Sequence, residues 1–321
     1  MKLASFEVNT PVGAVRRVGA HEDGSLIDIT AAYAARLADH GEQAPTAVAE
    51  AVVPPNMLEF LRRGDRALEA ASEAVAFAAG SDVTAPNGAR MHYDPEEVRL
   101  LSPLPRPNSI RDFMVFEEHV QNSLEGEIPD VWYEIPVYYK GNPDSVAHPN
   151  EAVEWPSYAD KLDYELELCV VIGKRGRDIP AEEADEYIGG YTIFNDFSAR
   201  DIQMKEMAGQ LGPTKGKDFA NGLGPYLVTP DSIEFENLHV TASVNGETWS
   251  EGDIGEMYHS FADIIEYVSQ NETLNPGDVL GTGTVGGGCG LELDRWIKPG
   301  DTVELEAEGI GTLRHEIVAG D

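Results

Sequence analysis

Residues 162–173 read LDYELELCVVIG, and this stretch decides the fold because acidic and apolar residues alternate in it before a continuous apolar run. Side chains of a strand point alternately to its two faces, so Asp163, Glu165 and Glu167 are predicted to share one face of a strand that enters the core. Crowded carboxylates repel one another, and a hard divalent cation such as Mg²⁺, Mn²⁺ or Ca²⁺ would hold them together. A solvent-exposed acidic face is the alternative that the pattern leaves open.

The composition is strongly acidic. The 57 Asp and Glu residues against 23 Lys and Arg give a formal net charge of −34, so we expect neither nucleic acid nor an anionic membrane as a partner. The acidic residues are spread over the whole chain and lysine is scarce, which indicates a halophilic protein adapted to high salt.

The cysteine content and the lack of long apolar segments indicate a cytoplasmic protein. Cys169 and Cys289 are the only two cysteines, which is typical of a reducing compartment and not of a disulfide framework. No apolar run reaches the length of a membrane span, and the first residues lack the pattern of a signal peptide. We therefore expect a cytoplasmic location and no membrane partner.

A proline-rich segment at 101–110 divides the chain into a small N-terminal α+β domain, 1–100, and a strand-rich domain, 101–321. Many strands with few helices between them favour an α+β, mainly β, fold in which a mixed sheet forms a roll. Helices are predicted at 31–39 and 57–79, and two more begin at Ser198 and Ser260, each capped with an aspartate three residues later. The predicted strands of the second domain are 135–140, 163–172, 189–194, 224–229, 238–245, 278–282, 290–294, 302–307 and 311–318.

Two polar segments carry candidate catalytic side chains. Asp112 and His119 lie seven residues apart, on one face if this stretch is helical, and His119 is the histidine best placed to act as a base, with a structural role as the alternative. A second segment places Arg200 and Gln203 one helical turn apart after a strand that ends at Asp196. The nearby loop 211–219 holds two of the eight lysines, which favours a contact between one of them and an anion.

The glycine-rich segment 281–286, GTGTVG, matches the dinucleotide-binding pattern. We expect a second strand after it and not a helix, so we reject that function and infer that its glycines allow close approach of a ligand, with Thr284 available to bind it. Glu292 alternates with leucines and points either to water or into a polar site. Cys289 is interpreted as a small buried residue and not as a nucleophile, because nothing nearby in the sequence would lower its pKa.

Taken together, six segments resemble the fumarylacetoacetate hydrolase family over about residues 105–318. The matching segments are 112–119 (DFMVFEEH), 135–141 (IPVYYKG), 162–167 (LDYELE), 195–203 (NDFSARDIQ), 211–217 (LGPTKGK) and 290–293 (GLEL). The resemblance implies a mixed β-roll, usually dimeric, with a smaller and variable N-terminal domain.

The resemblance also implies roles for individual residues. The implied metal ligands are Asp112, Glu165, Glu167 and Asp196, with Asp163 as a neighbour that does not bind the metal. The implied catalytic pair is His119 with Glu292, which activates water. Further implied roles are stabilisation of negative charge and binding of substrate oxygens by Arg200, Gln203 and Lys217, and substrate contact by Tyr139 and Thr284.

The function that this resemblance implies is hydrolysis of a carbon–carbon bond in fumarylacetoacetate or a related acylpyruvate, a β-diketo acid of aromatic catabolism. The metal, Mg²⁺ or else Mn²⁺ or Ca²⁺, would orient the keto acid, polarise its carbonyl and hold the resulting enolate, while His119 and Glu292 activate water. No organic cofactor is expected, and the expected partners are a small keto acid and a second copy of the chain.

Two alternatives stay open. The same site could dehydrate or hydrate 2-keto-3-deoxy sugar acids, or serve a decarboxylase or isomerase, because a His–Glu pair also moves protons in eliminations. A non-catalytic acidic metal-binding protein is the other alternative, but it gives no reason for the placement of Arg200, Gln203 and Lys217.

Overall fold

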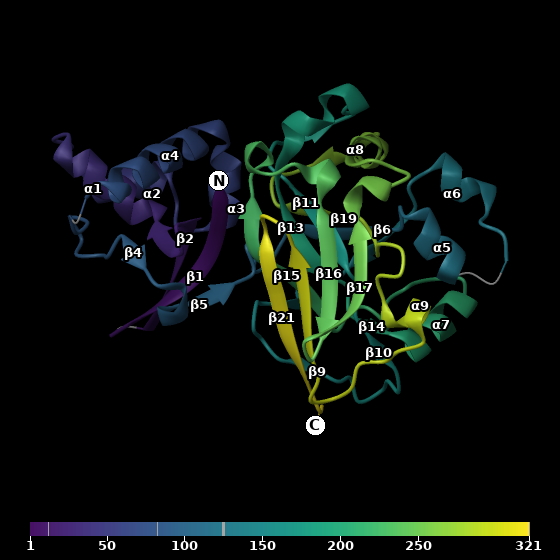
Figure 1. Ribbon diagram of the computed structural model, residues 1–321. Coiled ribbons are helices and arrows are strands. Elements are labelled where there is room, and N and C mark those ends of the chain that lie inside the picture. Colours follow the sequence, from purple (N-terminus) through teal and green to yellow (C-terminus); the bar gives the residue numbers. More distant parts are fainter. Residues whose placement is uncertain (12, 82, 124–125, 321) are drawn as a thin grey trace.

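The fold is built around two β-sheets, as seen in a computed structural model that describes residues 1–11, 13–81, 83–123 and 126–320. The larger sheet has the strand order β4-β3-β2-β1-β15-β13-β11-β19-β6-β7, with β5 beside β1 and β8 beside β15. Most neighbours are antiparallel, but β19 pairs with β6 and β15 with β8 in parallel, so the sheet is mixed (Figure 1). The predicted α+β, strand-rich class with a mixed sheet is confirmed.

The N-terminal residues form one end of this sheet and a group of helices that covers it. Its strands are β1 (Lys2–Thr10), β2 (Gly13–Glu22), β3 (Ser25–Asp28), β4 (His92–Tyr93) and β5 (Arg99–Leu101). Its helices are α1 (Ile29–Asp39), α2 (Pro45–Val52), α3 (Met57–Arg63) and α4 (Asp65–Ala79).

The remaining strands of the large sheet come from distant parts of the chain. They are β6 (Ser109–Phe113), β7 (Tyr138–Gly141), β8 (Val146–Ala147), β11 (Glu167–Ile172), β13 (Ile188–Asn195), β15 (Asn221–Val228) and β19 (Asp278–Gly281). The second sheet has the order β17-β16-β20-β21-β9. Its strands are β9 (Val153–Glu154), β16 (His239–Val244), β17 (Glu247–Asp253), β20 (Thr302–Ala307) and β21 (Gly311–Val318).

Short strand pairs and further α-helices lie outside the two sheets. The strand pairs are β10 (Leu162–Asp163) with β14 (Ser198–Ala199), and β12 (Gly176–Arg177) with β18 (Thr273–Leu274). The helices are α5 (Glu117–Ser123), α6 (Asp130–Glu134), α7 (Arg200–Ala208), α8 (Phe261–Ser269) and α9 (Gly290–Leu293). No helix in these ranges has the length and apolar character needed to cross a bilayer.

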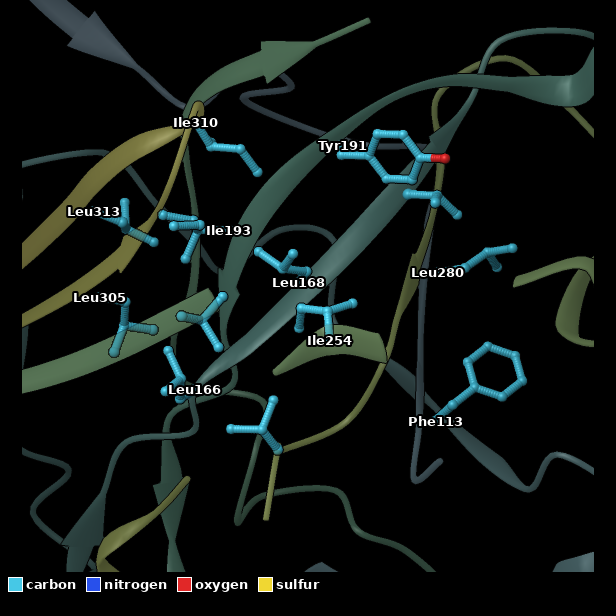
Figure 2. Close-up of a cluster of buried hydrophobic side chains, with 14 of the residues drawn as sticks. Phe113, Leu166, Leu168, Tyr191, Ile193, Ile254, Leu280, Leu305, Ile310 and Leu313 are labelled. Atoms are coloured by element: carbon cyan, nitrogen blue, oxygen red, sulfur yellow. The ribbon is translucent and has the colours of Figure 1, made fainter. Parts of the chain in front are cut away.

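Strand β11 is buried on both faces, which explains its uninterrupted apolar run. Leu168 and Val170 belong to the core between the two sheets, whereas Cys169 and Val171 belong to a second core shared with the N-terminal helices. Figure 2 shows side chains of the first core from both sheets, among them Leu168, Ile193, Leu305 and Leu313. Burial of one such leucine stabilises the fold by about 1.5–3 kcal/mol relative to exposure.

Two structural features cross the predicted boundary at residue 100. Strand β1 pairs with β15, so the large sheet runs through both parts of the chain. The second core joins Met57 and Phe60 of the N-terminal helices to Leu223 and Val279 of the sheet. The division into 1–100 and 101–321 stays a prediction.

Several predicted elements differ from the structure. The single helix predicted at 57–79 is two helices, because Gly64 adopts φ +58° between them, where glycine is favoured. The strand predicted at 163–172 is interrupted, so β10 ends at Asp163 and β11 begins at Glu167. The capping box at Ser260 and Asp263 is present at the start of α8 as predicted.

Candidate metal and acid–base site

Four buried carboxylates converge where the ends of β6, β11 and β13 meet in the large sheet. Asp112 lies on β6, Glu165 just before β11, Glu167 at the start of β11, and Asp196 directly after β13. One oxygen from each lies within 4.8 Å of the others, and all four side chains are buried. The sheet order explains this meeting, because β19 joins β11 to β6 and β13 borders β11 on its other side.

Gly281 on β19 makes room for Asp112. The two residues are register partners in the parallel β19–β6 pair. A Cβ atom at position 281 would lie 2.4 Å from Asp112 Oδ1 and 3.0 Å from the Phe194 ring. Glycine at this position therefore allows the carboxylate to reach the cluster.

The electrostatics of the cluster favour a bound cation. Burial, followed by repulsion from Asp196, raises the pKa of Asp112 well above its usual range, and burial next to Asp112 does the same to the pKa of Glu167. Burial raises the pKa of Asp196 to about 6 despite the nearby Lys217. Among the described residues, no hydrogen-bond partner reaches Asp112 Oδ1, Glu167 Oε2 or Asp196 Oδ1. Buried oxygens without partners are costly, and an all-oxygen donor set fits a hard divalent cation.

Two buried cations offset part of the negative charge. The ammonium of Lys217 donates to Glu165 and, at 2.6 Å, to Asp196 Oδ2. The guanidinium of Arg200 lies 2.8 Å from Glu165 Oε1 and donates at 3.0 Å to Gln203 Oε1. Burial opposes ionisation of Glu165, but Lys217 and Arg200 together lower its pKa to about 2.

The two residues expected to contact substrate also border the cluster. The hydroxyl of Tyr139 donates to Asp196 Oδ2 at 2.5 Å, and the hydroxyl of Thr284 donates to Glu167 Oε1 at 3.3 Å. Both side chains therefore help to hold carboxylate oxygens in place.

His119 and Glu292 form a hydrogen-bonded pair between α5 and α9. His119 Nδ1 lies 2.7 Å from Glu292 Oε1, and both side chains are buried. The other carboxylate oxygen accepts from Asn122 Nδ2 at 2.9 Å and from the Gly287 amide at 2.8 Å. The pKa of Glu292 is below its usual value. Burial raises this pKa, but several contacts together outweigh burial, and the hydrogen bond from His119 is the largest of them. A carboxylate that holds an imidazole in one orientation is the arrangement used in general base catalysis.

Cys289 connects this pair to the carboxylate cluster. Its backbone pairs with Glu165, and its thiol lies 3.4 Å from Glu292 Oε1. His119 is close enough to Glu165 to contribute to its lowered pKa. Burial raises the pKa of the Cys289 thiol and outweighs the opposing effect of Arg200, which disfavours a nucleophilic role for this cysteine.

Three sequence-based expectations about local structure are wrong here. Asp112 and His119 do not share a helix face, because Asp112 lies on β6 and His119 on α5. Ser198 does not cap a helix: it belongs to β14, its hydroxyl donates to the Asp196 carbonyl, and α7 begins at Arg200. Residues 290–294 are not a strand, since α9 spans Gly290–Leu293, and it is this helical turn that carries Glu292.

Asp163 has a role that sequence reasoning did not find. Its carboxylate accepts from Arg200 Nε at 2.8 Å and from the amides of Gly290 and Leu291 at 2.7 and 2.9 Å. It therefore fixes both Arg200 and the start of α9, which carries Glu292. The alternation in 162–167 marked Asp163 as part of the acidic face but could not reveal these distant partners. Asn122 was also missed, although it follows His119 by one helical turn and a search for polar partners at that spacing would find it.

Comparisons with known proteins agree on one family. Residues 108–318 match the family model described as fumarylacetoacetate (FAA) hydrolase C-terminal. The chain is 34% identical over 269 residues to the mitochondrial oxaloacetate tautomerase FAHD2A of Homo sapiens, covering 83% of this chain and 81% of that protein. It is also 34% identical over 276 residues to the oxaloacetate tautomerase YisK of Bacillus subtilis, with coverage of 83% and 87%.

Solved structures of similar fold span nearly the whole chain. The fumarylacetoacetate hydrolase of Exiguobacterium antarcticum superposes with a TM-score of 0.72 at 25% identity, covering 99% of this chain and 100% of that one. The maleylpyruvate hydrolase of Sphingobium sp. SYK-6, solved with manganese(II) and pyruvate, superposes with a TM-score of 0.70 over both full chains at 22% identity, a likeness of fold alone.

Proposed function

The chain belongs to the fumarylacetoacetate hydrolase family, and we propose that it catalyses proton transfer at the carbon beside the carbonyl of a small 2-oxo acid, with keto–enol tautomerisation of oxaloacetate as its first expected reaction. The observation that carries this proposal is the 2.7 Å contact between His119 and Glu292 beside the four-carboxylate cluster. Support for the substrate comes from the oxaloacetate tautomerases that are 34% identical to the chain.

The carboxylate cluster would hold the metal. The ligands would be Asp112, Glu165, Glu167 and Asp196, and the three oxygens without hydrogen-bond partners are the evidence in this chain that a cation belongs there. When bound, a divalent ion, with Mg²⁺ expected first, would supply the positive charge that polarises a carbonyl and makes the adjacent carbon more acidic.

The acid–base step falls to His119. Glu292 orients its ring through Nδ1 and would stabilise the imidazolium that forms when the other ring nitrogen accepts a proton. Asn122 and the Gly287 amide keep Glu292 in place, so the pair is set before substrate arrives. In the keto-to-enol direction, His119 would take the proton from carbon and pass it to the carbonyl oxygen. This transfer is the net change in a tautomerisation.

Buried cations would stabilise negative charge that develops on the substrate oxygen. Lys217 is the main candidate, because its ammonium lies at the edge of the carboxylate cluster. Arg200 contacts Asp163, Glu165 and Gln203 together, so we assign it to holding these side chains in position.

Hydrolysis of an acylpyruvate is the second candidate, and the same His119–Glu292 pair favours it. The pair could remove a proton from water instead of from carbon, and the resulting hydroxide would attack a carbonyl of the β-diketo acid. Breakage of the carbon–carbon bond would then give two carboxylic products, whereas tautomerisation leaves the carbon skeleton intact.

One set of assays separates these reactions. The Mg²⁺-loaded protein would be given enol oxaloacetate, fumarylpyruvate, fumarylacetoacetate and 2-keto-3-deoxy acids, with product composition followed by NMR and the oxaloacetate enol by its ultraviolet absorbance. We expect faster loss of the enol than in a matched solution of buffer and Mg²⁺, without new carbon fragments. Cleavage of an acylpyruvate with no effect on oxaloacetate would replace the first candidate with the second. No effect on any of these substrates would contradict both.

A further inference from the structure

His119, Cys289 and Glu292 form a second group of potential metal ligands, separate from the four carboxylates. One donor atom from each lies within 4.8 Å of the other two. Glu292 Oε1 is central, at 2.7 Å from His119 Nδ1 and 3.4 Å from Cys289 Sγ. The His and Cys are buried, and the Glu292 side chain is 1% exposed.

The donor types of this second group differ from those of the first. The four-carboxylate cluster offers only oxygen, which suits hard ions such as Mg²⁺. The second group offers one nitrogen, one sulfur and one oxygen, and thiolate with imidazole selects Zn²⁺ and other softer ions. Zinc sites of the open, catalytic type usually have three protein ligands and a water molecule in the fourth position.

We propose that His119, Cys289 and Glu292 bind Zn²⁺, and that this binding inhibits the enzyme by occupying its base. The inhibitory part rests on the function proposed above. On binding, the Cys289 thiol releases its proton to solvent and the ring proton of His119 moves from Nδ1 to Nε2, so that the thiolate sulfur, Nδ1 and a Glu292 carboxylate oxygen can each bond to zinc. His119 Nδ1 is then a zinc ligand and no longer bonds to Glu292. The ring can therefore no longer act as the base.

The local scaffold supports this geometry. His119 and Glu292 stand on two short helices, α5 and α9, and Cys289 immediately precedes α9. Asn122 and the Gly287 amide hold the second Glu292 oxygen and leave Oε1 for the metal. The three donor atoms thus lie close enough together to surround one ion.

Cobalt provides a test that does not depend on activity. Co²⁺ occupies zinc sites, and its bond to a thiolate gives a charge-transfer absorption in the near ultraviolet that oxygen ligands do not give. We expect this absorption when Co²⁺ is added to the Mg²⁺-saturated protein, and its displacement by Zn²⁺. Equilibrium dialysis in excess Mg²⁺ should show one bound Zn²⁺ per chain.

The second cysteine supplies the matched control. Cys289→Ser should lose the cobalt absorption, and Cys169→Ser, whose thiol donates to a backbone carbonyl on β13, should keep it. Cys289→Ala and Cys169→Ala repeat the comparison if a serine variant does not fold, as judged by circular dichroism. Glu167→Gln should also keep the absorption, because it alters only the carboxylate cluster. An absent absorption in the parent protein, or one that survives in Cys289→Ser or Cys289→Ala, would overturn the site.

Inhibition is tested separately on whichever substrate the assays identify. With Mg²⁺ in excess, Zn²⁺ should inhibit the parent and Cys169→Ser, and Cys289→Ser should require at least about tenfold more Zn²⁺ because thiolate is the strongest of the three donors. Cobalt binding without inhibition by zinc would support the metal site but overturn its regulatory role. A protein inactive on every substrate but with the Cys289-dependent absorption would contradict the proposed function and not the metal site.

Discussion

His119 Nδ1 and Glu292 Oε1 lie 2.7 Å apart although 173 positions separate the two residues in the sequence. If this pair is the catalytic base, His119→Ala should lower kcat by about 10²–10⁴-fold, the usual contribution of general acid–base catalysis. Glu292→Gln should also lower kcat, and metal affinity should change little in both. The measurement is steady-state kinetics with Mg²⁺ binding followed in parallel.

The control for this prediction is a second His–carboxylate pair. His239 Nδ1 lies 2.9 Å from Asp253 Oδ1, but this pair is about half exposed, on β16 and β17. His239→Ala should leave kcat unchanged. Equal losses in the two alanine variants would show that the effect on kcat is not specific to the proposed base.

Removal of the Glu167 charge should weaken metal binding but stabilise the metal-free protein. Glu167→Gln should weaken Mn²⁺ binding by about 10²-fold or more, since one of four oxygen ligands loses its charge. Burial and Asp112 raise the pKa of Glu167, so its contribution to stability is present below the unfolded pKa and is lost as pH rises through the raised value. The metal-free variant should therefore melt at a higher temperature than the parent at pH 8.

Calorimetric titration and thermal melts with and without a chelator measure both effects. Glu186→Gln is the control, because Glu186 is an exposed glutamate paired with Lys174 on the surface. It should alter neither quantity. Parent-like Mn²⁺ affinity in Glu167→Gln would exclude Glu167 as a ligand.

Asp163→Asn should destabilise the protein. Asp163 balances the buried Arg200 and accepts the first amides of α9, and removal of one charge from a buried ion pair costs about 3–5 kcal/mol. Urea denaturation measures the loss. Asp160→Asn, at an exposed aspartate three residues away, should change the free energy of unfolding by less than about 0.5 kcal/mol. A similarly small effect at Asp163 would mean that Arg200 does not depend on it.

Gly281→Ala should disturb the carboxylate cluster through Asp112. The added methyl group would lie 2.4 Å from Asp112 Oδ1, and relief of such overlap in a packed core costs about 1–3 kcal/mol. We expect lower stability together with weaker Mn²⁺ binding. Gly80→Ala, where a Cβ meets no atom within 4 Å, should retain parent affinity. Unchanged Mn²⁺ binding in Gly281→Ala would contradict the role given to this glycine.

Asp28 provides a pH-dependent test away from the site. It caps α1 through the Ala31 amide, and burial raises its pKa to about 6 although Arg17 lies 3.5 Å away. Its contribution to stability is therefore present below the unfolded pKa, near 3.8, and is lost as pH rises through about 6.

Asp28→Asn should match the parent near pH 4 and exceed its free energy of unfolding by about 1–3 kcal/mol at pH 8. Denaturation curves across this range measure the difference. Asp94→Asn, which changes an exposed aspartate that also caps a helical turn, is the control variant. A pH-independent difference at Asp28 would show that its carboxyl is ionised throughout.

The class of fold could be predicted from the strand pattern of the sequence, whereas the four members of the acidic cluster were implied only by the family resemblance. The acidic alternation before the apolar run of β11 indicated where Glu165 and Glu167 would stand, and the buried run itself indicated a central strand. The role of these carboxylates as metal ligands stays a prediction, as do the choice of Mg²⁺, the homodimer, the cytoplasmic location and the adaptation to high salt.

Contacts between distant segments could not be predicted in the same way. Leucine spacing around Glu292 fits a strand as well as a helical turn, and the hydrogen bonds from the first α9 amides to the distant Asp163 favour the turn. Ser198 has the composition of a helix cap, but pairing of β14 with β10 takes its backbone into a strand. Each error arises where a tertiary contact overrides a local preference.

Strand β19 lies between β11 and β6, and this order has a consequence for synthesis on the ribosome. Asp112, Glu165, Glu167 and Asp196 have all been translated long before Asp278–Gly281. Until those later residues emerge and insert, β6 has no neighbour on that side through which to join β11. A nascent chain that stops short of β19 would carry every acidic side chain of the cluster and still leave them apart.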